Sequence, residues 1–282
     1  MATIADLFQL HPLAVEDARH EHQRPKVEKY EHFVFLVFHT VNLEASRREL
    51  TTGELDIFVG QNYLITVHTE PIQELDEVEQ RWKRNSTQLG KGIGILLYSF
   101  LDTIVDHYFP VVDALVDQAE TLEAHIFAGA GTVRKRQFTL DLLALKKRFF
   151  AFCWIVTPEC DVLNVFSNRD SPFFPEPITI YFRDVYDHLT QLTDTLDLYR
   201  DQLSTIMDAN VSIVSNELNK VMRTLMAMLL LLMFNALVFS IYSMNFENMP
   251  ELKWQYGYFG ILALMAIVNT LLMLFSRRLK RF

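Results

Sequence analysis

The chain has 282 residues, of which 50% are hydrophobic, and its formal net charge is −9. Seven basic and two acidic residues follow position 219 and give that segment +5, so residues 1–219 carry −14. A part this acidic argues against nucleic acid as a partner and favours cations.

Residues 1–90 are predicted to form a small α/β domain. Helices are expected at 13–19 and 72–84. Three short segments rich in β-branched and aromatic residues, at 32–41, 55–59 and 63–68, predict strands because turn residues separate them. We therefore expect a sheet of three strands.

Residues 91–177 change to a helical pattern and are expected to form a helical hairpin. Long helices are predicted at 93–127 and 133–166. Pro110 and Pro158 should kink or interrupt these helices, because proline removes a backbone donor and clashes with the preceding turn.

A single long helix is predicted for residues 178–243, since no Pro or Gly lies between Ile178 and Ser243. At 1.5 Å per residue, about 65 residues would extend roughly 100 Å. A mostly apolar seam recurs along it in steps of three or four, at Phe182, Val185, Leu189, Leu192, Leu196, Tyr199, Leu203, Ile206, Asn210, Val214, Leu218 and Val221. Such a helix requires partner helices, most simply identical ones about a symmetry axis.

Two uncharged apolar segments, 224–242 and 257–275, are each close to the roughly 20 residues that cross a bilayer as a helix. We expect two transmembrane spans joined by an external loop, 244–256, and followed by a basic tail, 276–282. Basic residues before the first span and after the second place both termini in the cytoplasm. No segment near Met1 resembles a signal peptide, so the acidic domain is expected to stay inside the cell.

One face of the first span is a candidate pore lining. At 100° per residue, an arc of about 100° collects the following residues, with Asn219 at its edge: Met222, Leu225, Met226, Leu229, Met233, Ala236 and Ser240. A ring of such faces would form a hydrophobic constriction that gates by expelling water. The same stripe is equally typical of ordinary helix packing. Asn235 lies off this arc and is expected to hydrogen-bond another helix, with Asn269 as its candidate partner.

The loop after the first span carries the most specific motif, Tyr242-Ser243-Met244-Asn245-Phe246, followed by Met249-Pro250-Glu251-Leu252. It closely resembles the loop of the CorA family of divalent-cation channels, which begins Tyr-Gly-Met-Asn. The His11-Pro12-Leu13 segment and the stretches 98–102 and 181–188 resemble the same family, so the resemblance covers essentially the whole chain. CorA relatives carry more residues before the position of Leu7, so the first domain is expected to be shortened.

The resemblance implies roles for the loop and the pore. Ser243, Met244 and Asn245 would form the selectivity loop, and a ring of Asn245 side chains would hold hydrated Mg²⁺ through its water shell, which this ion gives up reluctantly. Glu247 and Glu251 would either concentrate cations at the mouth or form a solvated face. Family positions matching Asn219, Met222, Leu229 and Met233 face the pore. Ser243 departs from the family's glycine, which permits backbone conformations that serine adopts only at a cost.

Four carboxylates match the family's magnesium-sensing sites at subunit interfaces: Glu16, Asp17, Asp102 and Asp184. From residue chemistry alone, each is equally a solvated or salt-bridged surface acid. His20-Glu21-His22 resembles part of a zinc site, but too few ligands accompany it in the sequence, and we interpret it as loop polarity.

Together these patterns predict a membrane protein, α with a small α/β cytoplasmic part. The expected architecture is a CorA-like funnel with one long stalk and pore helix and two transmembrane helices per subunit. By family resemblance it would be a homopentamer in a bacterial or archaeal plasma membrane. It would transport Mg²⁺ passively inward, with Co²⁺ and Ni²⁺ as further candidates, under the control of cytoplasmic Mg²⁺. The alternatives are a zinc or other transition-metal transporter of the same superfamily, and a non-conducting membrane-anchored magnesium sensor or scaffold. No phosphate-binding loop or hydrolase motif supports an enzyme.

Overall fold

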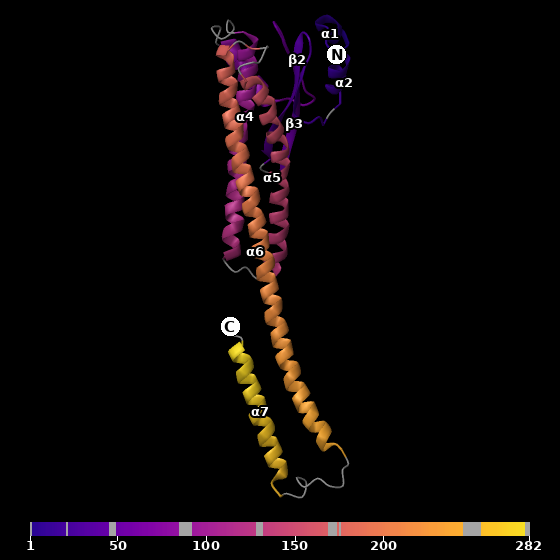
Figure 1. Ribbon diagram of the computed structural model, residues 1–282, viewed down its shortest axis with the longest axis vertical. Coiled ribbons are helices and arrows are strands. Elements are labelled where there is room, and N and C mark those ends of the chain that lie inside the picture. The colour runs from indigo at the N-terminus through magenta and orange to yellow at the C-terminus, as the bar shows by residue number, and fades with distance from the viewer. Residues whose placement is uncertain are drawn as a thin grey trace. The chain divides into compact units, whose positions relative to one another are not determined.

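The computed structural model shows a mostly helical chain with one small antiparallel sheet (Figure 1). It describes residues 2–20, 22–44, 49–84, 92–127, 132–168, 174, 176–244 and 255–279. The chain divides into two compact units, Met1–Met207 and Asp208–Phe282, and the boundary falls within helix α6 (Glu176–Tyr242).

The sheet of the first unit has the strand order β1-β2-β3-β4, with every neighbouring pair antiparallel. Its strands are β1 (Lys26–Lys29), β2 (Phe33–Glu44), β3 (Glu49–Gly60) and β4 (Leu64–Val67). The prediction of three strands is therefore wrong by one. Strand β1 reads Lys-Val-Glu-Lys and has no strand pattern of its own. It becomes a strand because it pairs with β2, which is apolar on both faces.

Each face of the sheet is covered by a different set of helices. Val34, Leu36 and Phe38 belong to a core shared with α3 (Gln73–Arg84), α4 (Ile93–Phe127), α5 (Thr132–Ser167) and α6. Phe33, Phe35 and Val37 alternate with them and belong to a second core, shared with α1 (Ala2–Phe8) and α2 (Pro12–Asp17). Side chains of a strand alternate between its faces, so the sheet separates α1 and α2 from the long helices (Figure 1).

The long helices run through their prolines. Pro110 lies inside α4 and Pro158 inside α5, and neither interrupts its helix. In α6 the predicted seam is confirmed within the first unit, where Phe182, Leu189 and Leu196 are fully buried. Packing of this seam against α4 and α5 offsets the cost of ordering a long helix.

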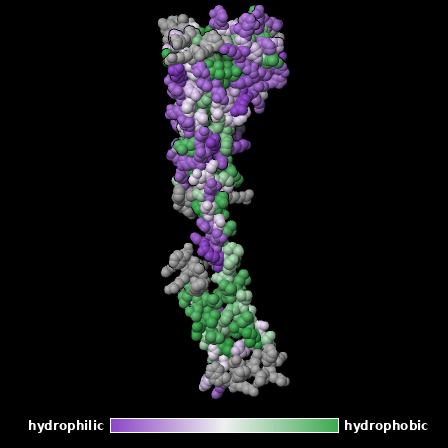
Figure 2. Space-filling model, in the orientation of Figure 1, coloured by the Kyte–Doolittle hydropathy of each residue, from purple (hydrophilic) through white to green (hydrophobic). Residues whose placement is uncertain are grey.

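The second unit contains the end of α6 and helix α7 (Gly257–Leu279). Figure 2 shows apolar side chains on the last part of α6 and on α7, after a hydrophilic stretch of α6. Asn269 Nδ2 donates to Asn235 Oδ1 at 3.1 Å, and Asn235 Nδ2 lies 3.4 Å from Asn269 Oδ1. The expected Asn235–Asn269 partnership is thereby confirmed.

Among the described residues, four helices are long and apolar enough to cross a membrane. Two of them, in α4 and α5, are half buried within the fold. The apolar stretch of α6 is not buried at all, and that of α7 is 11% buried. Apolar stretches that already contribute to a folded core need no lipid, whereas those in α6 and α7 lack cover within the chain.

Candidate cation sites and pore face

Two helices bring Asp102, Asp184 and His188 together. Asp102 lies on α4, and Asp184 and His188 lie one turn apart on α6, so both α6 side chains share a face. One ligand atom from each of the three lies within 4.8 Å of the others. Two carboxylates and an imidazole at this separation could hold a divalent cation. Sequence reasoning included both carboxylates and missed His188, although its spacing of four residues from Asp184 was the available signal.

The electrostatic surroundings of this group are acidic. Burial raises the pKa of Asp102, and the carboxylates of Asp106 and Asp184 raise it further, while a hydrogen bond from Tyr98 and the nearby His188 act to lower it. Burial and the same two site carboxylates, Asp102 and Asp184, raise the pKa of Tyr98 to about 12. Acidic groups held close together in a partly buried position repel each other, and a bound dication would relieve that repulsion.

The other two predicted ligands, Glu16 and Asp17, lie on the short helix α2. Glu16 is exposed. Asp17 already has a cationic partner, because Lys26 Nζ lies 2.7 Å from Asp17 Oδ2 and 2.6 Å from Glu28 Oε1. The Lys26 ammonium therefore occupies the position beside the Asp17 carboxylate that a bound metal ion would take.

Within one chain the four predicted carboxylates form two separate sets. Asp102 and Asp184 lie on the long helices, on one side of the sheet, and α2 packs on the other side. A site that includes all four would therefore have to combine residues from two different chains.

The predicted pore face is exposed along its whole length. Met222, Leu229 and Met233 are 49%, 63% and 65% exposed, and Asn219 and Ser240 are exposed as well. Leu225 and Met226 share this exposure, and part of the face lines a groove formed by Met226, Leu229, Leu230, Leu232, Met233 and Ala236.

The opposite face of α6 is the one that is partly covered. Its less exposed residues in this region recur in steps of one, three or four, at Thr224, Ala227, Leu231, Phe234, Asn235, Val238 and Tyr242. At about 100° per residue these positions centre on the side of the helix directly opposite the predicted pore face. The bonds between Asn235 and Asn269 place α7 on this covered side.

Only the beginning of the predicted selectivity loop is described. Asn245, Glu247 and Glu251 lie outside the described residues. Ser243 N–H donates to the carbonyl of Phe239 at 3.0 Å, which closes the last turn of α6. The non-glycine residues with positive φ in the described parts are Gln9 and His22, so the backbone cost expected for serine is not seen at Ser243.

Comparison with known proteins gives consistent matches over nearly the whole chain. Residues 1–278 match the family described as CorA-like Mg²⁺ transporter protein. The Bacillus subtilis protein YfjQ is 34% identical, over 94% of this chain and 81% of that protein. The cobalt/magnesium transport protein CorA of Thermotoga maritima is 32% identical, over 98% of this chain and 78% of that protein.

A solved structure supports the same relationship. The complete structure of the CorA magnesium transporter from Methanocaldococcus jannaschii matches with a TM-score of 0.81 and 25% identity, covering 98% of this chain and 86% of that one. Because the family match spans residues 1–278 of 282 and the relatives align over most of both lengths, the chain belongs to the CorA-like Mg²⁺ transporter family.

Proposed function

We propose that this chain assembles as a homopentamer around one pore and conducts Mg²⁺ passively into the cell. The observation that carries the proposal is the exposed face of α6 with Met222, Leu229 and Met233, opposite the face that meets α7. A Met- and Leu-rich face without cover in a single chain fits a ring of such helices lining a narrow tube. Co²⁺ and Ni²⁺ are further candidate ions, and the Thermotoga maritima relative is named for both cobalt and magnesium.

The seam of α6 supports assembly from identical chains. Its early residues are buried within the chain, but the same spacing continues at Val214, Leu218 and Val221, which are 38%, 61% and 56% exposed. Continuous apolar surface on a helix marks an interaction site, and copies of the same helix about an axis would cover it.

Asn245 is the proposed selectivity residue. Five asparagine carbonyls around the pore entrance would contact the water shell of Mg²⁺ without a charge that traps the dication. Ser243 and Met244 would position the loop, and Glu247 and Glu251 would raise the local cation concentration at its mouth. The membrane potential would supply about 2.3 kcal/mol per charge per 100 mV, so roughly 4.6 kcal/mol for a dication without ATP.

For topology we propose two spans, in α6 and α7, with both termini in the cytoplasm. The charge distribution supports this arrangement, because Lys220 and Arg223 precede the first span and a basic tail follows the second. The acidic first unit would then face the cytoplasm, where it can respond to the Mg²⁺ concentration inside the cell.

We further propose that cytoplasmic Mg²⁺ closes the channel by binding between neighbouring chains. Asp102 and Asp184 of one chain, with His188 beside them, would meet Glu16 and Asp17 of the next. Like charges at about 4 Å with an effective ε of 20 repel by about 4 kcal/mol before screening, so empty sites would push the chains apart. Bound Mg²⁺ would favour the closed state by its higher affinity for it.

Two other functions remain in competition with this one. A zinc or other transition-metal transporter would use the same architecture with a different ion preference. A non-conducting magnesium sensor or scaffold would keep the cytoplasmic site and lose ion flux. Flux of Mg²⁺ and Zn²⁺ into liposomes that contain the purified protein separates all three.

The selectivity proposal is tested by Asn245→Ala. This variant should abolish Mg²⁺ uptake into liposomes and still form the parent's oligomer, because the loop lies outside the helices that would assemble. Asn248→Ala, three residues later in the same loop, is the matched control and should conduct. Parent-like Mg²⁺ uptake by Asn245→Ala would show that the filter is elsewhere.

The regulatory proposal is tested by combining Asp17→Asn with Asp184→Asn. The double variant should conduct and should no longer be inhibited by cytoplasmic Mg²⁺, as measured by liposome current against Mg²⁺ concentration. Asp187→Asn, an exposed position less than one turn from Asp184, is the control. Inhibition of the double variant at the parent's midpoint would rule out these carboxylates as the sensor.

A further inference from the structure

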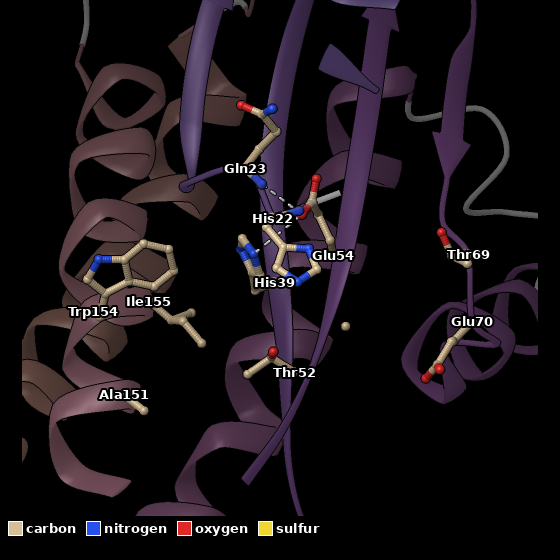
Figure 3. Close-up of a pocket in the computed structure, with 11 residues that line it drawn as sticks. His22, Gln23, His39, Thr52, Glu54, Thr69, Glu70, Ala151, Trp154 and Ile155 are labelled. Carbon is tan, nitrogen blue, oxygen red and sulfur yellow. Dashed lines mark hydrogen bonds and ion pairs between the residues drawn. The ribbon is translucent and has the colours of Figure 1, made fainter. Parts of the chain in front are cut away.

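Two histidines and a glutamate, residue types that can ligate metal ions, line a cavity in the first unit, outside the acidic group on α4 and α6. A cavity of about 660 Å³ lies among strands β2 and β3, the segment before β1, and helix α5 (Figure 3). His22, His39 and Glu54 line it together, and Trp154 lies on α5 at its apolar side. None of these residues belongs to the acidic group of Asp102.

His39 and Glu54 are fixed opposite each other by the sheet. They are direct partners in the β2–β3 register, so their side chains emerge on the same face. Glu54 Oε2 lies 4.0 Å from His39 Nε2. The backbone of His39 is held in turn, because its N–H donates to the buried Glu159 carboxyl at 2.9 Å.

The His39 imidazole is placed to act as a metal ligand. The residue is only 5% exposed, and it lines the cavity together with Glu54. Its Nδ1 is buried and has no hydrogen-bond partner among the described residues. A neutral imidazole beside a carboxylate is a common pair of transition-metal ligands.

His22 is anchored at the same carboxylate. Its backbone N–H donates to Glu54 Oε2 at 2.6 Å, and the next amide, of Gln23, donates to the same oxygen at 2.9 Å. His22 has a φ of 80°, a conformation that a non-glycine residue adopts at a cost. The two hydrogen bonds hold the backbone there, and His22 lines the same cavity as Glu54 and His39 (Figure 3).

We propose that His22, His39 and Glu54 form a binding site for a divalent transition metal such as Co²⁺, Ni²⁺ or Zn²⁺. Metal–nitrogen and metal–oxygen bonds of about 2.0–2.2 Å bring ligand atoms to roughly 3.0–3.4 Å from each other. The His39–Glu54 pair therefore closes by less than about 1 Å, and the exposed His22 ring turns to complete the set. Glu70, which also lines the cavity, adds negative charge that attracts a cation.

The ligand set distinguishes this site from a magnesium site. Imidazole suits cobalt, nickel and zinc, whereas Mg²⁺ prefers an octahedron of oxygen atoms and keeps much of its water. Two imidazoles and one carboxylate thus give a site that retains a transition metal when Mg²⁺ is in excess. The sequence alone suggested only loop polarity at His22, because the other two ligands are distant along the chain.

The test is calorimetric titration of the purified full-length protein with Co²⁺ in excess Mg²⁺, which occupies oxygen-rich sites. The parent should bind Co²⁺ under these conditions. His22→Asn removes a proposed nitrogen ligand and should weaken this binding by at least about 10-fold, the lower end of the cost of losing even an outer-shell partner. Asparagine also tolerates the positive φ at this position. Glu54→Gln should weaken it as well, although its amide oxygen still accepts the two backbone hydrogen bonds.

Two controls make the result specific. His20→Asn changes a histidine that hydrogen-bonds the Glu16 carbonyl of its own chain segment, and it should leave Co²⁺ binding unchanged. His188→Asn removes the imidazole of the acidic group and should also leave the Mg²⁺-resistant binding in place. Parent-like Co²⁺ affinity in both His22→Asn and Glu54→Gln would overturn the proposal, as would loss of this binding in His188→Asn alone.

Discussion

Lys26 acts as a built-in competitor for the cation proposed at Asp17. Its ammonium lies 2.7 Å from Asp17 Oδ2, and it bridges this carboxylate to Glu28. Burial acts to lower the pKa of Lys26, but the hydrogen bonds to Asp17 and Glu28 outweigh it and raise the pKa. The lysine is therefore charged at every physiological pH, and a metal ion at Asp17 must displace it or share its ligand.

Replacing Lys26 with methionine should tighten inhibition by cytoplasmic Mg²⁺. The side chains of Lys26 and Asp17 are each 29% exposed, so the pair is worth the modest amount typical of partly solvated ion pairs, about 0.2–1 kcal/mol. If that free energy no longer opposes Mg²⁺, the midpoint of inhibition should fall by about 1.4- to 5-fold at 25 °C. Methionine keeps most of the lysine stem, which limits the loss of packing.

The assay is liposome current against cytoplasmic Mg²⁺ concentration for the parent and Lys26→Met. Lys29→Met is the matched control, because Lys29 lies on the same strand and, by the alternation of strand side chains, on the opposite face. An unchanged or higher midpoint in Lys26→Met would refute the competition. A fall of equal size in Lys29→Met would assign the effect to net charge.

Two further predictions concern stability. Burial, with the charges of Glu54 and Asp17, raises the pKa of Asp56 from its ordinary 3.8 to about 7 against the opposing effect of Lys26. Between pH 4 and 7, roughly, the folded state keeps a proton that the unfolded state releases. The free energy of unfolding should therefore fall as the pH rises through this range, by up to about 4 kcal/mol. Asp56→Asn should flatten this pH dependence, as measured by thermal unfolding. Asn235→Leu should destabilise the α6–α7 pair by about 0.6–2 kcal/mol, and adding Asn269→Leu should restore most of it in detergent unfolding.

The helices were largely predictable because their signals are local. Spacing and the absence of Pro and Gly defined α6, and the predicted ends of α4 agree with the structure. Strand β1 was not predictable, since three of its four residues are charged and they become a strand only through pairing with β2. Of the two effects predicted for Pro110 and Pro158, an interruption is wrong, because α4 and α5 continue through them. A kink at either proline stays a prediction.

The candidate site residues were also predictable only in part. Asp102 and Asp184 were found through resemblance to a family, and the structure brings them together with His188. The pairing of His39 with Glu54 could not be found in the sequence, because it depends on the register of the β2–β3 hairpin. A shift of that register by one residue would turn one of the two side chains to the other face of the sheet.

Ligand chemistry would give the two proposed sites different tasks. A filter that contacts ions through their water shells would treat Mg²⁺, Co²⁺ and Ni²⁺ alike, because their hydrated forms are similar. Discrimination then requires atoms that replace water, and nitrogen does so for cobalt and nickel far more readily than for magnesium. On this reasoning, the carboxylates of Asp102 and Asp184 would respond to the abundant Mg²⁺. His22 and His39 would respond to scarce transition metals that enter by the same pore.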